Sequence, residues 1–133
     1  MKKKILIADD EPHVLRVLKM SLEKENYQVE TCANGREALD KLQIEHPDIL
    51  ITDIQMPKMT GEELCSHTNQ QFPERKFLIF VLTSRTEIEH REWSRQINNL
   101  QFLEKPVSIR NLIETIDTYF TVNSGTQIRS EDA

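Results

Sequence analysis

The chain has 133 residues, with 22 acidic and 17 basic side chains and a formal net charge of −5. This length suits one domain with its own hydrophobic core. The acidic balance counts against direct binding of nucleic acid, and against binding to a membrane surface through a basic helix. The longest apolar run, residues 77–82, is far short of the ~20 residues of a membrane-spanning helix. We therefore expect a protein that binds neither nucleic acid nor membrane.

The two cysteines and the start of the chain indicate a compartment. Cys32 and Cys65 form no disulfide framework and have no metal-ligand neighbour at close spacing, so we interpret them as reduced thiols. The first residues contain only a short apolar run before acidic side chains, which is too little for a secretory signal. We expect a cytoplasmic protein.

Strand and helix patterns alternate along the chain. Continuous apolar runs are typical of strands buried on both faces of a parallel sheet, and apolar residues at helical spacing indicate helices that cover it. In chain order we expect a strand at 5–8, a helix at 12–25, a strand at 27–33, a helix at 35–45, strands at 49–52 and 77–82, a helix at 86–99, a strand at 101–104 and a helix at 108–120. Ser108 suits the N-cap of the last helix. This alternation predicts an α/β fold with a parallel sheet and right-handed crossovers.

Two segments have weaker patterns. The expected fourth helix, 86–99, is crowded with charge and has a thin apolar stripe, so Trp93 either packs inward, which we favour, or faces a partner. Residues 121–133 are polar and follow the domain of residues 1–120 as a tail or the start of a linker.

Acidic side chains follow two of the expected strands. Asp9 and Asp10 come directly after the first strand and Asp53 ends the third. Ligands of open parallel sheets bind at the carboxyl ends of the strands, so these carboxylates are expected to converge if the two strands are neighbours. Carboxylates that lie so close repel one another, and Mg²⁺, which takes oxygen ligands, would relieve that repulsion. The alternative is that the Asp9–Asp10 pair only caps the first helix, with Pro12 in its first turn.

Two further strand ends supply complementary groups. Thr83 and Ser84 end the fourth strand, and Lys105 ends the fifth. A hydroxyl, backbone N–H groups and an ammonium suit an anion carried on an aspartate, and Asp53 can act as a nucleophile toward phosphorus to give an aspartyl phosphate.

The ordered set of motifs resembles the receiver domain of two-component response regulators over about residues 3–120. The matching segments are Asp9-Asp10-Glu11-Pro12, the Asn34-Gly35-Arg36-Glu37-Ala38-Leu39 turn, Asp53, Met56-Pro57-Lys58-Met59-Thr60-Gly61, Thr83-Ser84, Phe102 and Lys105-Pro106. The resemblance implies a flavodoxin-like (βα)5 doubly wound sheet of five parallel strands in the order 2-1-3-4-5. It also implies a cis peptide bond before Pro106.

The resemblance also implies roles for particular residues. The catalytic residues would be Asp53, which is phosphorylated, together with Lys105 and Thr83, which bind the phosphoryl oxygens. Mg²⁺, with Mn²⁺ as an alternative ion, would be held by Asp9 (through water), Asp10, Asp53 and the carbonyl of Gln55. Thr83 and Phe102 would form the switch, and Ser84, Gln55 and Arg85 would flank the phosphoryl group.

The implied function is a phosphoryl-accepting signalling switch. The donor would be a sensor histidine kinase or a phosphotransfer protein, and the face of helix 4, strand 5 and helix 5 would signal to a downstream protein or a fused output domain. A homodimer through helices 4 and 5 would use the same face. The chain would catalyse its own phosphorylation and autodephosphorylation without turning over an external substrate.

The chain departs from the family's usual motif at one turn, and three other classes of protein are alternatives. Asn98-Asn99 replaces the family's usual Gly-Ala, and asparagine tolerates the left-handed backbone such a turn needs. A phosphohydrolase of the haloacid-dehalogenase kind needs a second acid at position 55, where this chain has Gln55. A flavodoxin-like nucleotide binder would want a Gly-, Ser- or Thr-rich loop after the first strand. The main alternative is a pseudo-receiver, a binding module that works without phosphorylation.

Overall fold

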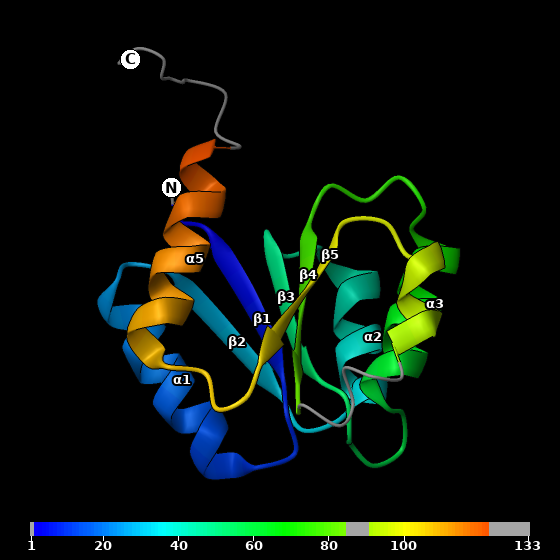
Figure 1. The fold of residues 1–133 in the computed structure, drawn as a ribbon, viewed down its shortest axis with the longest axis horizontal. Coiled ribbons are helices and arrows are strands. Elements are labelled where there is room, and N and C mark those ends of the chain that lie inside the picture. Colours follow the sequence, from blue (N-terminus) through cyan, green and yellow to red (C-terminus); the bar gives the residue numbers. More distant parts are fainter. Residues whose placement is uncertain (1, 85–90, 123–133) are drawn as a thin grey trace.

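The computed structural model describes residues 2–84 and 91–122 of the chain. Five parallel strands form one sheet in the order β2-β1-β3-β4-β5 (Figure 1). Their bounds are β1 Lys4–Ala8, β2 Gln28–Cys32, β3 Ile49–Asp53, β4 Leu78–Thr83 and β5 Leu100–Glu104. The predicted fold class and strand order are confirmed.

Helices cover both faces of this sheet. The α-helices are α1 Pro12–Lys24, α2 Gly35–Ile44, α3 Gly61–Gln71 and α5 Ile109–Val122, and a 3-10 helix, η1, spans Arg91–Gln96. Helices α1 and α5 pack on one face, and α2 and α3 pack on the other (Figure 1). The chain therefore winds in both directions from β1, which creates the reversal point where ligands bind in such sheets.

Alternation along the strands explains why their apolar runs are continuous. Successive side chains of a strand point to opposite faces of the sheet. Leu50 and Ile79 join the core beneath α2 and α3, whereas Ile51 and Phe80 join the core beneath α1 and α5. All residues of β3 and β4 are buried. A strand with helices on both faces needs apolar side chains in both directions.

The helix starts follow local capping chemistry. The Asn34 side chain caps α2 by accepting a hydrogen bond from the Glu37 N–H at 2.9 Å. The Ser108 hydroxyl accepts one from the Asn111 N–H at 3.1 Å, which confirms its predicted role at the start of α5. Thr60 and Glu63 form a reciprocal capping box at the start of α3. This box is the clearest local signal for α3, because few of its side chains are buried.

The predicted fourth helix is wrong in part. Residues 91–96 form the 3-10 helix η1 instead of an α-helix, and residues 86–90 lie outside the described residues. Tight i→i+3 winding is usual for a short connector, and Trp93 and Ile97 pack against the core under α2 and α3. Trp93 packs inward, as favoured, with its ring centroid 5.8 Å from that of Phe102.

Asn99 makes the turn into β5. Its φ of 56° lies in the left-handed region that asparagine tolerates, as predicted from the sequence. Its side-chain amide donates a hydrogen bond to the Phe77 carbonyl oxygen at 3.0 Å. This residue therefore fixes the entry of the edge strand against the start of β4.

The last helix is held at its C-terminal half by an aromatic group. The Tyr27 hydroxyl donates a hydrogen bond to the Asp117 carboxylate, and the Tyr27 and Phe120 rings are 5.6 Å apart. The helix continues to Val122, two residues past its expected end. No helix within the described residues combines the length and apolar character needed to cross a membrane.

Candidate functional site

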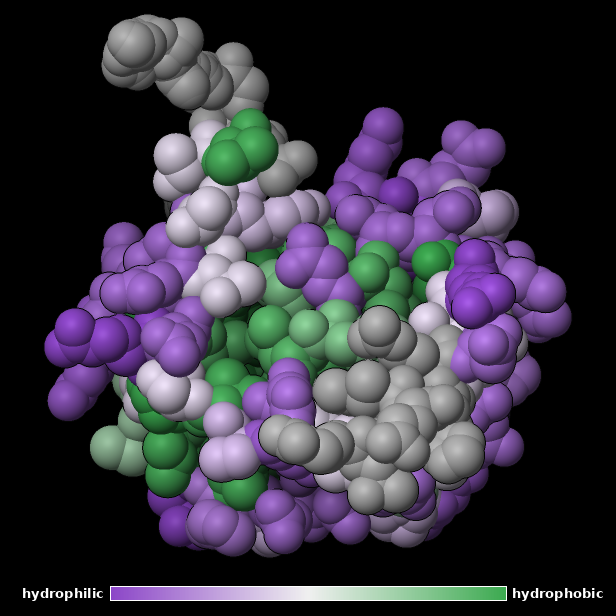
Figure 2. All heavy atoms as spheres, in the orientation of Figure 1, coloured by the Kyte–Doolittle hydropathy of each residue, from purple (hydrophilic) through white to green (hydrophobic). Residues whose placement is uncertain are grey.

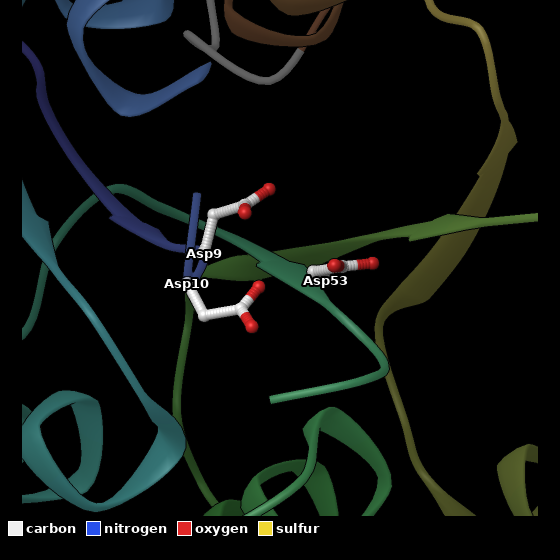
Figure 3. A group of neighbouring side chains, drawn as sticks. All are labelled: Asp9, Asp10 and Asp53. Carbon is white, nitrogen blue, oxygen red and sulfur yellow. The ribbon is translucent and has the colours of Figure 1, made fainter. Parts of the chain in front are cut away.

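Three carboxylates meet at the carboxyl end of the sheet. Asp9 and Asp10 directly follow β1, and Asp53 is the last residue of β3. The pairing of Ala8 with Thr52 places the two strand ends side by side. One carboxylate oxygen from each of the three residues lies within 4.8 Å of the others, and Figure 3 shows the three side chains around one space. The predicted convergence of these acids is confirmed.

The three acids differ in burial. Asp9 and Asp53 are 2% and 5% exposed, whereas Asp10 is exposed. Burial raises the pKa of Asp9, the Asp53 charge raises it further, and a hydrogen bond from the Glu11 N–H at 2.9 Å opposes the rise. That bond also shapes the turn into α1, so Asp9 serves both the helix start and the acidic cluster.

Lys105 reaches the cluster from the end of β5. Its Nζ atom lies 2.7 Å from Asp53 Oδ1, and the same oxygen accepts a hydrogen bond from the Ile54 N–H at 2.9 Å. The Lys105 N–H donates to the Thr83 carbonyl oxygen at 2.7 Å, and the bond to Pro106 is cis, as predicted. Both polar contacts that the described residues make to this carboxylate fall on Oδ1.

The predicted switch residues lie on the neighbouring strands β4 and β5. Thr83 is fully buried at the end of β4, one residue beyond Leu82, the strand partner of Asp53. Its hydroxyl donates to the carbonyl oxygen of the half-buried Ser84 at 3.2 Å. Phe102, half-buried, pairs with Val81 and contacts the Trp93 ring.

Two more residues, Gln55 and Arg85, are predicted to flank the phosphoryl group. Gln55 is exposed in the loop that follows Asp53. Arg85 lies outside the described residues.

The anchors of the loop after Asp53 were missed by sequence reasoning. Residues 54–60 connect β3 to α3, and the loop buries Met56 and Met59 in the core under α2 and α3. The Gly35 N–H donates to the Met59 carbonyl oxygen, and the Gly61 N–H donates to the Ile54 carbonyl oxygen. Both glycines stand in the recognised motifs, but nothing in the sequence shows that their backbones touch this loop.

The acidic cluster suits a hard divalent cation. Its three candidate ligands are all carboxylates, which favours Mg²⁺ or Mn²⁺ over softer metals. Three carboxylates and the Lys105 ammonium have a formal sum of −2, and burial together with the Asp53 charge raises the pKa of Asp9. Asp9, Asp10 and Asp53 are the groups that would hold such an ion.

An apolar groove opens beside the acids. It has a volume of 550 Å³ and runs between α1 and the segment that follows β5. Asp9 and Lys105 lie at its polar end, and Val17, Leu18 and Ile109 line its apolar part. Because Asp9 and Lys105 line it, the groove borders the site around Asp53.

The fold and site together define a class of protein. The family model described as the response regulator receiver domain matches residues 5–117. The chain belongs to this family, which acts in two-component signalling. The family match, the strand order and the acidic pocket agree on one assignment.

Individual relatives support the same class. The chain is 35% identical over 112 residues to the alkaline phosphatase synthesis transcriptional regulatory protein PhoP of Bacillus subtilis. The aligned region covers 84% of this chain and 46% of that protein. The chain is 31% identical over 134 residues to the transcriptional regulatory protein ResD of the same organism, covering 93% of this chain and 54% of that protein. The chain thus spans about half the length of these curated relatives.

Solved structures of similar domains align with this chain over nearly their whole length. A CheY-like receiver domain protein from Methanospirillum hungatei has a TM-score of 0.81 and 31% identity, covering 90% of this chain and 94% of that one. The chemotaxis response regulator CheY4 of Vibrio cholerae has a TM-score of 0.78 and 31% identity, covering 89% and 98%.

Proposed function

We propose that this chain is a switch in which Asp53 accepts a phosphoryl group from the phosphohistidine of a sensor histidine kinase or a phosphotransfer protein. The observation that carries the proposal is the arrangement around one carboxylate. Lys105 and the Ile54 N–H hold Asp53 Oδ1, and the Asp53 carboxylate lies beside those of two further acids. A pseudo-receiver would have no need for this set of charges.

The proposed transfer exchanges one bond to phosphorus for another. Asp53 Oδ2 attacks the phosphorus atom and forms a P–O bond, while the N–P bond of the phosphohistidine breaks. The electron pair of that bond goes to the imidazole nitrogen, which takes a proton. Lys105 balances charge on the phosphoryl oxygens, and the Thr83 hydroxyl can donate to one of them. Bound Mg²⁺ would supply further compensation of that charge.

Loss of the phosphoryl group closes the cycle. A water molecule attacks phosphorus, the bond to Asp53 breaks, and inorganic phosphate leaves with the carboxylate restored. Gln55 is exposed two residues after Asp53, and its side chain is the proposed control on access of that water. The chain would in this way catalyse its own modification and its reversal, with no external substrate turned over.

The output face is proposed to lie on the β5 side of the molecule. Phosphorylation would favour an arrangement in which Thr83 contacts the phosphoryl group and Phe102 fills the space behind Thr83. This is a population shift between two packings of the same residues. Figure 2 shows apolar side chains gathered over β5 and beside α5, with hydrophilic residues around them. A hollow lined in part by Gln101, Tyr119 and Val122 lies on this face.

The remaining partner proposals follow from the family. A downstream protein or a fused output domain would read the β5 and α5 face, and the same face is the proposed surface for a homodimer. The groove between α1 and the segment after β5 is the proposed binding site for the phosphoryl donor, because Asp9 and Lys105 line it. The working compartment of such a pathway is the cytoplasm.

Intact-mass measurement tests the proposal. Incubation with acetyl phosphate and Mg²⁺ should add a single group of about 80 Da. The adduct should be absent with EDTA and lost in Asp53→Asn. Asp40→Asn removes an exposed acid of α2 and serves as the matched control, which should still be modified. An unmodified wild-type chain would instead favour the pseudo-receiver.

A further inference from the structure

A hydrogen bond joins the start of α2 to the loop that follows Asp53. The Gly35 N–H donates to the Met59 carbonyl oxygen at 3.1 Å. Gly35 is the first residue of α2, where N–H groups have no partner inside the helix. The N-terminal end of a helix also carries partial positive charge, which favours a carbonyl oxygen. The contact therefore uses an N–H group that has no partner inside α2 to hold the loop at Met59.

Glycine is required for this approach. A Cβ atom at Gly35 would lie 2.3 Å from the Met59 carbonyl oxygen and 3.0 Å from the carbonyl carbon. Directly after the loop, a Cβ atom at Gly61 would lie 2.1 Å from the Asp53 carbonyl oxygen. The Gly61 N–H donates to the Ile54 carbonyl oxygen at 2.7 Å, which ties the end of the loop to its start. Two backbone contacts, each open only to glycine, therefore restrain the loop: Gly61 closes its base, and Gly35 holds it at Met59.

The interior of the loop is restrained as well. Met56 and Met59 are 7% and 9% exposed and belong to the core cluster that contains Ala38 of α2. Lys58 has a φ of 68°, and the Met59 N–H donates to the Pro57 carbonyl oxygen at 2.7 Å, which makes a tight turn. Gln55 lies between the pinned Asp53 and the buried Met56, so its backbone has little freedom.

We propose that Gly35 is a positioning residue for the divalent cation. By holding Met59 it fixes the loop that carries Gln55, whose carbonyl would be a ligand of that cation. This inference rests on the proposed function, in which Asp53 is phosphorylated with Mg²⁺ bound. Groups that orient ligands from behind typically change metal affinity by about 10–100-fold.

The size of the expected effect follows from the contact. The side chain of Gly35→Ala would have to push the Met59 carbonyl away by roughly 1 Å to reach normal van der Waals separation. Because the loop is short and pinned at Gly61, the displacement would be passed along to Gln55. We expect the Mg²⁺ dissociation constant to rise by about 10-fold, at the lower end of that range.

Calorimetric titration of Mg²⁺ into the apo chain tests this inference directly. The variants are Gly35→Ala and, as a control, Ile116→Val, a mild truncation in the fully buried core on the opposite face of the sheet. Unfolding in EDTA measures the stability of each variant without metal. Phosphorylation by acetyl phosphate is then compared at limiting and at saturating Mg²⁺.

The expected result separates positioning from simple destabilisation. Gly35→Ala should bind Mg²⁺ about 10-fold more weakly and reach the wild-type adduct only at saturating Mg²⁺. Ile116→Val should bind Mg²⁺ as the wild type does, despite its lower stability in EDTA. If Gly35→Ala does not fold, Asn34→Ala replaces it, because loss of the cap frays the same helix start.

Two outcomes would overturn the inference. Wild-type Mg²⁺ affinity in the folded Gly35 variant, or in its Asn34 replacement, would show that the contact has no influence on the site. An equal loss of affinity in Ile116→Val would show that any destabilisation has this effect. If the wild-type chain binds no Mg²⁺, the proposed function fails first, and the positioning role fails with it.

Discussion

Replacement of Lys105 by methionine should affect metal binding and phosphoryl transfer in opposite directions. The Lys105 Nζ atom lies 2.7 Å from Asp53 Oδ1, beside three carboxylates. Without the ammonium, the formal charge of the pocket changes from −2 to −3. A more negative pocket should attract a divalent cation more strongly. The same substitution removes a positive group that would stabilise charge on the transferring phosphoryl group.

The two effects have different magnitudes. The Lys105 side chain is 39% exposed, so solvent screens the ion pair, and its net contribution is about 1 kcal/mol. A comparable change in the pocket's attraction for Mg²⁺ corresponds to roughly a fivefold tighter affinity. Loss of one preorganised electrostatic contact in a transition state slows a reaction by about 10²–10³-fold. Phosphorylation should therefore slow far more than Mg²⁺ binding tightens.

Calorimetry and timed intact-mass measurement check the two halves separately. Lys105→Met is titrated with Mg²⁺ and then phosphorylated with acetyl phosphate at saturating Mg²⁺. Lys105→Arg keeps the charge and should bind Mg²⁺ with wild-type affinity. The reasoning is refuted if Lys105→Met is phosphorylated within about threefold of the wild-type rate, a loss well below that of one electrostatic contact. Weaker Mg²⁺ binding in this variant would refute the charge argument.

Two further predictions concern stability. Tyr27→Phe removes the hydrogen bond to Asp117, and urea unfolding should show a loss of about 1 kcal/mol, since the exposed carboxylate can be rehydrated. Glu30 contacts Lys41 at 2.7 Å and Lys4 at 3.0 Å, and these cations lower its pKa below the ordinary value of 4.5. Its stabilising contribution is therefore present above pH 4.5 and is lost as the pH falls through the lower, folded-state pKa. The difference in unfolding free energy between wild type and Glu30→Gln should shrink over that fall in pH.

The controls for these two predictions lie close by in the fold. A double-mutant cycle with Asp117→Ala should give a coupling of about 1 kcal/mol with Tyr27→Phe, and a coupling near zero would contradict the assigned hydrogen bond. Glu25→Gln neutralises an exposed acid that makes no ion pair with any described residue, so its unfolding free energy should follow that of the wild type. A pH-independent difference for Glu30→Gln would mean that the Lys4 and Lys41 contacts do not act through charge.

Local chemistry explains why much of the fold could be predicted from the sequence. A strand between two helical layers must be apolar on both faces, so the runs at 49–51 and 77–82 identify buried parallel strands. Parallel strands bring their carboxyl ends to one edge, which places Asp9 and Asp53 together. Asn99 adopts the left-handed turn because its side chain tolerates that backbone. The strands and the turn depend on a few neighbouring residues, and the acids meet once β1 and β3 lie side by side.

Contacts between distant segments were decided only by the tertiary structure. The segment around Trp93 forms a 3-10 helix because it must pack its few apolar side chains on β5 and then turn at Asn99. Gly35 and Met59 are 24 positions apart, and their backbones meet because α2 and the loop after β3 pack side by side. The sequence by itself predicted which side chains the proposed chemistry would use. The packing of helices and loops determined how firmly those side chains are held, because such contacts depend on the whole assembled core.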